Sequence, residues 1–289
     1  MNSFVRNFFQ PKQTTYSLEI SASEIKDHIF KVPENPVFSI LIPSWNNLSY
    51  LKLCIDSILK NSKYQHQILV HLNDGQDGSR EYLNEMKITH STSPDNIGIC
   101  WSLNHLRSHV QCDYILYIND DMYLCPHWDE KLLRKAKSFK DDMFYLSSTM
   151  IEPRDTGNAC VVGGKNYGDS VETFKESALL ADCDQLIRQD WLGSTWPPSL
   201  VSTRLWDLVG GYSVEFSPGF YSDPDFSKKL WNVGVREFIG VGNSLAYHFM
   251  SKSTSKIKAN DGRMGFIKKW DMKASYFCDK ILKRGQTLE

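Results

Sequence analysis

The stretch Val37-Phe38-Ser39-Ile40-Leu41-Ile42, which ends at Pro43, is an almost unbroken apolar run of strand length. A run of this kind is typical of a strand that is buried on both faces of a parallel sheet. A helix is predicted next, because Asn46 or Asn47 can cap its first turn. Apolar residues then recur every three or four positions from Leu51 to Leu59, which gives this helix one apolar face. The stretch therefore reads as the first strand and helix of an α/β domain.

The same alternation continues over the following hundred residues. We expect strands at 68–72, near 88, at 114–118 and at 143–146, and helices at 79–86, 96–109 and 128–139. Strands that alternate with helices predict crossover connections and a Rossmann-like, mainly parallel sheet with helices on its faces. Beyond about residue 150 the alternation breaks, and the glycines of 153–170 indicate loops or a hairpin.

Length and composition exclude several classes of protein. The chain has 289 residues, 41% of them hydrophobic, and a net charge of −1, which is typical of a globular protein and argues against a nucleic-acid partner. Its seven cysteines form no CxxC pair, which argues against a cysteine zinc cluster and against a disulfide framework. We find no apolar run of membrane-spanning length and no signal peptide at the amino terminus. These features together predict a cytoplasmic location.

The last segment, residues 249–289, differs from the rest in charge. It carries ten basic and four acidic side chains, and we expect it to form a helical tail. A basic tail can make peripheral contact with an anionic membrane or approach a phosphorylated substrate. A lysine-rich helix that simply faces water explains the same composition, so both interpretations stay open. The sequence gives no indication of the oligomeric state.

Polar segments follow the predicted strands, where ligands bind in open parallel sheets. There are four of them: Pro43-Ser44-Trp45-Asn46, Asn73-Asp74-Gly75, Asn96-Ile97-Gly98 and Asn119-Asp120-Asp121. None contains the glycine-rich loop of dinucleotide-binding proteins or of P-loop enzymes. The adjacent carboxylates Asp120 and Asp121 would repel each other after a buried strand unless a cation neutralised them. A hard divalent ion such as Mg²⁺ or Mn²⁺ suits such a site, whereas an exposed turn or a helix cap is the plainer alternative.

The order of these four segments resembles the nucleotide-sugar half of family 2 glycosyltransferases, which have a GT-A fold. The second half agrees, because Gly210-Gly211-Tyr212, Ser222-Asp223-Pro224-Asp225-Phe226 and Gly234 resemble the acceptor-side block of that family. The resemblance covers residues 36–250. It implies a nucleotide-sugar-binding half (36–150) and an acceptor-binding and catalytic half (151–248). Outside it, the mixed polar and apolar residues 1–35 indicate an N-terminal leader or edge element, and 249–289 is the basic tail.

The resemblance also implies roles for individual residues. Asp121 matches the carboxylate that binds a metal bridging the donor diphosphate, and His248 falls where some members supply a metal ligand. Asp223 matches the general base of inverting members, although Ser222 replaces the usual Glu before it. The residues matched to the donor site are Pro43, Ser44, Asn46, Asn73, Asp74, Asn96, Gly98, Asn119 and Asp120. Asp225 is assigned to the acceptor side. The rings of Trp191 and Trp196 could stack on sugar faces there, whereas packing in a core is the alternative for aromatic residues next to prolines.

The resemblance thus implies a metal-dependent, inverting glycosyltransferase of the hexosyltransferase type, with Mn²⁺ or Mg²⁺ as cofactor. It would move a sugar from a nucleotide-diphosphate donor to a hydroxyl of a glycan, lipid-linked or other acceptor. Asn73, Asn119 and Ser222 depart from the family pattern, and so favour a second hypothesis, a non-catalytic carbohydrate- or lipid-binding descendant. A sugar-phosphate nucleotidyltransferase is the third, although no basic loop follows the first strand. Asn104 is expected to tie down a loop through hydrogen bonds.

Overall fold

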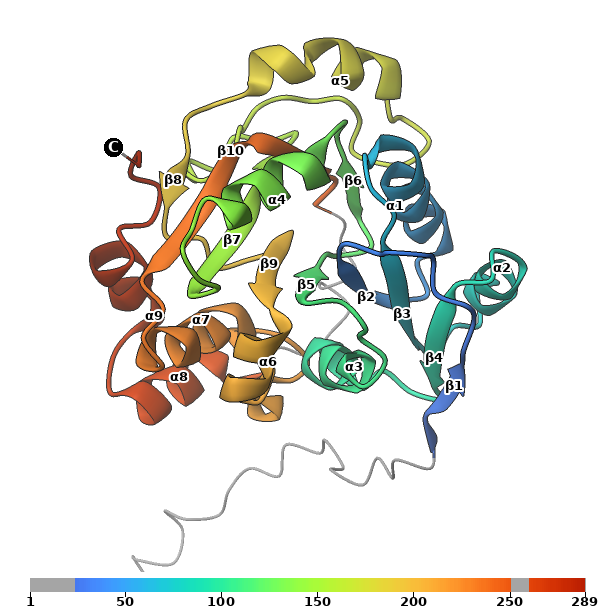
Figure 1. The fold of residues 1–289 in the computed structure, drawn as a ribbon, viewed down its shortest axis with the longest axis horizontal. Helices are drawn as coiled ribbons and strands as arrows, with labels where there is room; N and C mark the ends of the chain where they lie inside the picture. The colour runs from blue at the N-terminus through green and yellow to red at the C-terminus, as the bar shows by residue number, and fades with distance from the viewer. Residues whose placement is uncertain (1–23, 251–259, 289) are drawn as a thin grey trace, which may run out of the picture.

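The computed structural model describes residues 24–250 and 260–288, and places their strands in one mixed sheet. The order across the sheet is β1-β4-β3-β2-β5-β9-β7-β10-β6, and β8 pairs with β10 off this path. Figure 1 shows β2, β3 and β4 on one side, β7 and β10 on the other, and β5 and β9 between them. The strands are β1 (Lys26–His28), β2 (Ser39–Trp45), β3 (Gln67–Asn73), β4 (Thr89–Ser93), β5 (Tyr114–Tyr117), β6 (Met122–Leu124), β7 (Phe144–Ile151), β8 (Trp191–Leu192), β9 (Ser199–Ser202) and β10 (Glu237–His248).

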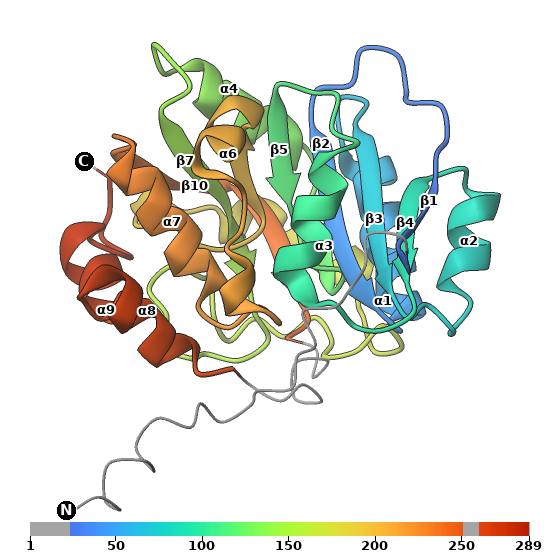
Figure 2. The same cartoon turned by 90° about the horizontal axis from the view of Figure 1, so that it is seen from below.

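Helices cover both faces of this sheet. They are α1 (Leu48–Asn61), α2 (Ser79–Glu85), α3 (Gly98–Arg107), α4 (Trp128–Lys137), α5 (Glu176–Asp182), α6 (Thr203–Val209), α7 (Ser222–Asn232), α8 (Gly262–Trp270) and α9 (Ala274–Tyr276). In Figure 2 helices α3, α6 and α7 lie on the same face of the sheet. No helix in the described part of the chain is both long and apolar enough to cross a membrane.

The parallel core confirms the predicted crossover units. Strands β4, β3, β2 and β5 pair in parallel, and β7 pairs in parallel with β10. In β2, Ile40 and Ile42 join the core cluster under α1 and α4, whereas Leu41 joins the cluster under α3 and α6. All three side chains are fully buried, which explains why the sequence of this strand is nearly continuous in apolar residues.

The sheet is mixed, because β1 runs antiparallel to β4, and β9 runs antiparallel to both β5 and β7. The predicted strand at 143–146 begins at Phe144 and continues to Ile151, where it pairs along β10. The glycine-rich stretch 153–170 forms loops, with a single isolated bridge between Ile151 and Val162. The alternation therefore ends where the sequence indicated.

The start of α1 differs from the prediction. Asn47 occupies the cap position, but its side chain makes no capping hydrogen bond, and Asn46 lies one residue further out with a φ of 45°. Instead, the Leu48 N–H donates to Asp77 Oδ2 at 2.7 Å. The first turn of α1 is thus satisfied by a carboxylate from the loop after β3, which also favours the positive end of the helix dipole.

Most of the basic segment is part of the folded domain. Phe266 in α8 and Phe277 after α9 are fully buried, in the same core cluster as Phe226 of α7. Thr287 forms an isolated bridge to Trp191. Residues 260–288 therefore pack as core helices and not as a detached tail, while 251–259, with three of the ten basic side chains, lie outside the described residues. Contact with an anionic membrane stays a prediction.

Candidate active site

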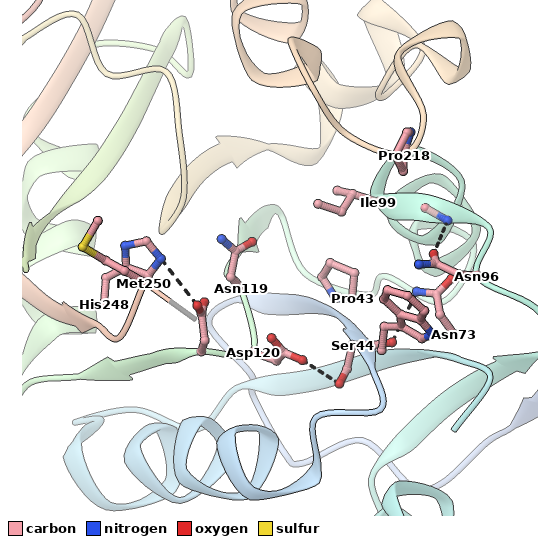
Figure 3. Close-up of a pocket in the computed structure, with 13 residues that line it drawn as sticks. Pro43, Ser44, Asn73, Asn96, Ile99, Asn119, Asp120, Pro218, His248 and Met250 are labelled. Carbon is pink, nitrogen blue, oxygen red and sulfur yellow. Dashed lines mark hydrogen bonds and ion pairs between the residues drawn. The ribbon is translucent and has the colours of Figure 1, made fainter. Parts of the chain in front are cut away.

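A cavity of about 390 Å³ lies beyond the carboxyl ends of β2, β3 and β5, and we call it the larger cavity (Figure 3). The loops that follow these parallel strands converge there because the strands end at the same edge of the sheet. Its lining residues are Pro43, Ser44, Trp45, Asn73, Asn96, Gly98, Ile99, Asn119, Asp120, Asp121, Pro218, His248 and Met250. The structure thus gathers most of the predicted donor and metal residues around one space.

The two adjacent carboxylates at this cavity are buried. Asp120 is 8% exposed and Asp121 is 7% exposed, so the alternative of an exposed turn is wrong. The Ser44 hydroxyl donates to Asp120 Oδ2 at 2.7 Å (Figure 3). Burial and the neighbouring charge of Asp121 raise the pKa of Asp120 to about 7. A pair of buried carboxylates that disfavour each other's charge is a site that a cation would stabilise.

His248 and Glu152 complete the charged group. His248, at the end of β10, places Nε2 3.6 Å from Asp121 Oδ2 and Nδ1 3.0 Å from Glu152 Oε1. Burial alone would lower the pKa of His248, but the two carboxylates raise it to about 9. Glu152, only 5% exposed, was not predicted from the sequence. The available signal was its position directly after the buried strand β7, since the acidic pair also follows a buried strand, β5.

These side chains fit a divalent cation. Asp120, Asp121 and His248 offer carboxylate oxygens and an imidazole nitrogen on the wall of one cavity. Carboxylates suit Mg²⁺ and Mn²⁺, and an imidazole moves the preference towards the transition metals, hence towards Mn²⁺. These carboxylate oxygens and this imidazole nitrogen thus support Asp121 and His248 as candidate metal ligands, with Asp120 beside them.

Asn73 ties the loops of the larger cavity together. Its Nδ2 donates to the Ser44 carbonyl and to Ser102 Oγ, both at 3.3 Å, and its Oδ1 accepts from the Ile97 N–H at 2.8 Å. Ser44 lies at the end of β2, Ser102 in α3 and Ile97 just before α3, so Asn73 positions the walls of the cavity. An Asp at this place could not make the two donated bonds, which accounts for the departure from the family pattern.

Two predicted donor residues lie outside this lining. Asn46 and Asp74 bind each other, with Asn46 Nδ2 donating to Asp74 Oδ2 at 2.8 Å. Asn96 does line the cavity, and its Oδ1 accepts from the Gly98 N–H at 2.9 Å. Gly98 has a φ of 79°, and a Cβ there would lie 2.7 Å from Pro218 Cα, so this wall requires glycine.

A second cavity of about 310 Å³, the smaller cavity, adjoins the first. The two share Ile99, Asn119, Pro218 and His248 in their linings. Asp223 lines the smaller cavity half-buried, and the Tyr212 hydroxyl donates to its Oδ1 at 3.1 Å. Burial raises the pKa of Asp223 to about 7, although the hydrogen bond from Tyr212 acts in the opposite direction. A carboxyl that ionises near neutral pH is suited to general-base catalysis.

Asp223 lies in the first turn of α7 and not at its cap position. The helix begins one residue earlier, at Ser222, and Tyr221 occupies the cap position without a side-chain hydrogen bond. Ser222 is only 2% exposed, and its hydroxyl donates to the Gly219 carbonyl at 2.6 Å. A small hydroxyl therefore closes this buried turn, which gives a physical reason for Ser where the family pattern has Glu.

Of the three predicted acceptor residues, only Trp196 lines the smaller cavity. Trp191 is fully buried, and its Nε1–H donates to Thr149 Oγ1 at 2.8 Å. Asp225 is also fully buried, and it accepts from Trp270 Nε1 at 2.8 Å. Trp191 belongs to the core, and Asp225 attaches α8 to α7, so both assignments to the acceptor side are corrected.

The prediction that Asn104 ties down a loop is confirmed. Its Nδ2 donates to the Tyr212 carbonyl at 2.7 Å, and its Oδ1 accepts from the Tyr212 N–H at 2.8 Å. These bonds hold the tyrosine whose hydroxyl contacts Asp223.

The Asn104→Ala variant is therefore expected to lose about 1–3 kcal/mol of unfolding free energy, because both backbone groups of Tyr212 lose their partner. Urea unfolding measures this loss, with Asn84→Ala on the exposed surface of α2 as the matched control. Equal stability of the two variants would contradict the role of Asn104.

Comparison with known proteins identifies the family. The model described as "Glycosyl transferase family 2" matches residues 39–193, more than half of the chain. This chain belongs to glycosyl transferase family 2. The match includes Asp120 and Asp121 but ends before Asp223 and His248, so the assignment of those two residues rests on the geometry of the cavities.

Individual relatives of this family 2 chain are distant. Chondroitin synthase of Pasteurella multocida (strain Pm70) is 24% identical over 213 residues, which cover 72% of this chain and 20% of that protein. EpsH of Bacillus subtilis (strain 168), named as a glycosyltransferase, is 26% identical over 132 residues, which cover 43% of this chain and 37% of EpsH. The chain thus spans well under half the length of either relative.

Among solved structures, this chain is similar to those of S. aureus TarS. TarS 1–349 is 13% identical with a TM-score of 0.49, over 74% of this chain and 58% of that chain. The same protein in complex with UDP-GlcNAc is 12% identical with a TM-score of 0.48, over 74% and 56% of the two chains.

Proposed function

We propose that this chain is a metal-dependent, inverting glycosyltransferase that uses a nucleoside-diphosphate sugar and a hydroxyl acceptor of a glycan, a lipid-linked sugar or another molecule. The observation that carries the proposal is the pair of adjoining cavities. The larger one contains Asp120, Asp121 and His248, and the smaller one contains Asp223. A donor diphosphate and an acceptor hydroxyl could therefore occupy the two sides of a shared boundary.

On the donor side, the nucleoside would lie along Pro43, Ser44 and Asn96, with its diphosphate directed towards Asp121. When bound, a Mn²⁺ or Mg²⁺ ion held by Asp121 and His248 would stabilise the negative charge that develops on the leaving diphosphate. Ser44 keeps Asp120 in place through its hydrogen bond, which fixes the carboxylate pair before the donor binds.

On the acceptor side, Asp223 would take the proton of the attacking hydroxyl. The acceptor oxygen forms a bond to the anomeric carbon while the bond from that carbon to the diphosphate oxygen breaks. A single displacement of this kind inverts the anomeric configuration. Trp196 lines the same cavity and offers an aromatic surface for a sugar ring. Tyr212 orients the Asp223 carboxylate through its hydroxyl.

The pH dependence follows from the pKa of Asp223. Since this carboxyl has a raised pKa of about 7, it is protonated and inactive as a base below that pH. We expect kcat/KM to rise as the pH increases from 6 to 8. The residual rate of the Asp223→Asn variant should not rise over this pH range. Burial of the ionised form also costs stability, so Asp223→Asn should unfold at an equal or higher temperature at pH 8. If the rate of Asp223→Asn still rises with pH over this range, the pH dependence belongs to another group.

A thermal-shift screen tests the proposed function directly. Nucleoside diphosphates and nucleotide-sugars are added to the full chain with Mn²⁺ or with EDTA, since a ligand that binds the native state raises the Tm. We expect at least one nucleoside diphosphate to raise the Tm only with Mn²⁺. Release of that diphosphate from its sugar donor, measured by a coupled assay, then separates an enzyme from a non-catalytic descendant. The absence of any Mn²⁺-dependent shift would contradict the proposal.

A further inference from the structure

A second group of metal-ligating side chains lies away from the two cavities. Asp27 of β1, His105 of α3 and His109 just beyond α3 offer ligand atoms that all lie within 4.8 Å of one another. His105 Nε2 is 2.8 Å and His109 Nε2 is 3.1 Å from the same atom, Asp27 Oδ1. None of the three lines the larger or the smaller cavity.

Hydrogen bonding within the group is incomplete. His109 Nε2 is shielded from solvent and has no well-aligned hydrogen bond among the described residues, although it approaches Asp27. A shielded imidazole nitrogen thus lies 3.1 Å from a carboxylate oxygen that also contacts His105.

We propose that Asp27, His105 and His109 form a structural site for a Zn²⁺-type transition-metal ion. Two imidazole nitrogens and one carboxylate oxygen are donors that Zn²⁺ binds at about 2.0–2.2 Å, with water free to take a fourth position. Tetrahedral ligation needs nitrogen–oxygen separations of about 3.4 Å, only slightly wider than those present. Two imidazoles favour Zn²⁺ over Mg²⁺, so this site differs in chemistry from the carboxylate pair.

The surroundings tolerate the added positive charge. His71 contacts the His105 ring at a centroid distance of 6.2 Å, and its two nitrogens already bind Ser91 and Ser93. Burial lowers the pKa of His71 to about 3, so it stays neutral. Arg107 is paired with Asp207 at 2.6 and 2.7 Å. The ion would also lie near the carboxyl end of α3, where the helix dipole favours a cation.

An ion at this site would strengthen the attachment of the edge strand β1 to the rest of the domain. Strand β1 is three residues long and pairs only with β4 among the described strands, so it is weakly held. An ion shared by Asp27, His105 and His109 would fasten this edge strand to α3. The other end of α3 carries Gly98 and Ile99, which line the larger cavity. The ion would therefore stabilise a helix that forms a wall of the active site.

The test uses the full chain without an affinity tag, after EDTA treatment and dialysis. Calorimetric titration with ZnCl₂ should show one Zn²⁺ bound per chain at this site, and Zn²⁺ at about 100 times its Kd should raise the Tm by roughly 5 °C. Asp121→Asn should keep this shift, which separates the site from the catalytic cavity. His127→Gln, at an exposed histidine elsewhere, is the matched control and should also keep it.

The His105→Gln/His109→Gln double variant should lose the Zn²⁺-dependent rise in Tm and the visible absorption of Co²⁺ bound in place of Zn²⁺. If the double variant does not fold, Asp27→Asn at the exposed edge strand provides the same comparison. The proposal is overturned if Zn²⁺ leaves the Tm of the unmodified chain unchanged, or raises it equally in the variants that lack the ligands.

Discussion

The Asp121→Ala variant is expected to lose the Mn²⁺ dependence of nucleoside-diphosphate binding and about 10²–10⁴-fold of the transfer rate. The reason is the position of Asp121, which lies buried on the wall of the larger cavity, 3.6 Å from His248. Without this carboxylate the cation would lose an anionic ligand, and the leaving diphosphate would lose the charge that stabilises it. Calorimetry of a nucleoside diphosphate with Mn²⁺ and with EDTA measures the change.

Asp113→Ala is the matched control for this prediction, because Asp113 is exposed and lies just before β5, at the opposite end from the acidic pair. It should bind nucleoside diphosphate and Mn²⁺ as the unmodified chain does. If the unmodified chain binds equally well in EDTA, the metal role of Asp121 is wrong.

The Asp223→Asn variant is expected to keep its affinity for the donor and to lose about 10²–10⁴-fold in kcat. Asn has nearly the same shape and can still accept the hydrogen bond from the Tyr212 hydroxyl, but it cannot take a proton from the acceptor. Donor binding by calorimetry and transfer under saturating acceptor separate the two steps.

Asp225→Asn, two residues along the same helix, provides the control. This residue binds Trp270 and Lys269 and is fully buried, so its substitution should lower the Tm without changing the pH limb of the rate. Full transfer activity in Asp223→Asn would exclude Asp223 as the base.

Local sequence was sufficient to predict how the core is built. The run from Val37 to Ile42 predicted a strand buried on both faces, and the structure places its side chains in two core clusters. The polar segments after the strands were expected to meet, because parallel strands carry their carboxyl ends to one edge. Ser44, Asn73 and Asp121 do line the same cavity. The periodicity of apolar residues and the order of strands and helices can be read from short segments. These predictions therefore required no knowledge of contacts between residues far apart in the sequence.

Other expectations failed because distant segments decide burial. Trp191 and Asp225 were assigned to the acceptor side, but β8 pairs with β10, and α8 covers Asp225. Glu152 was missed because its partner His248 lies 96 positions away. The spacing of His105 and His109 was visible in the sequence, but Asp27 joins them across 78 positions.

The sequence by itself determined the alternation of strands and helices, the parallel core and the polar strand ends from which a ligand site is built. Only the tertiary structure decided which of those side chains face a cavity, which of them hold loops in place, and where Asp223 lies relative to Asp121. The physical reason is that the exposure, pKa and partners of a side chain depend on the segments packed around it. In this chain those segments, such as β10 beside β7 and β6, come from distant parts of the sequence.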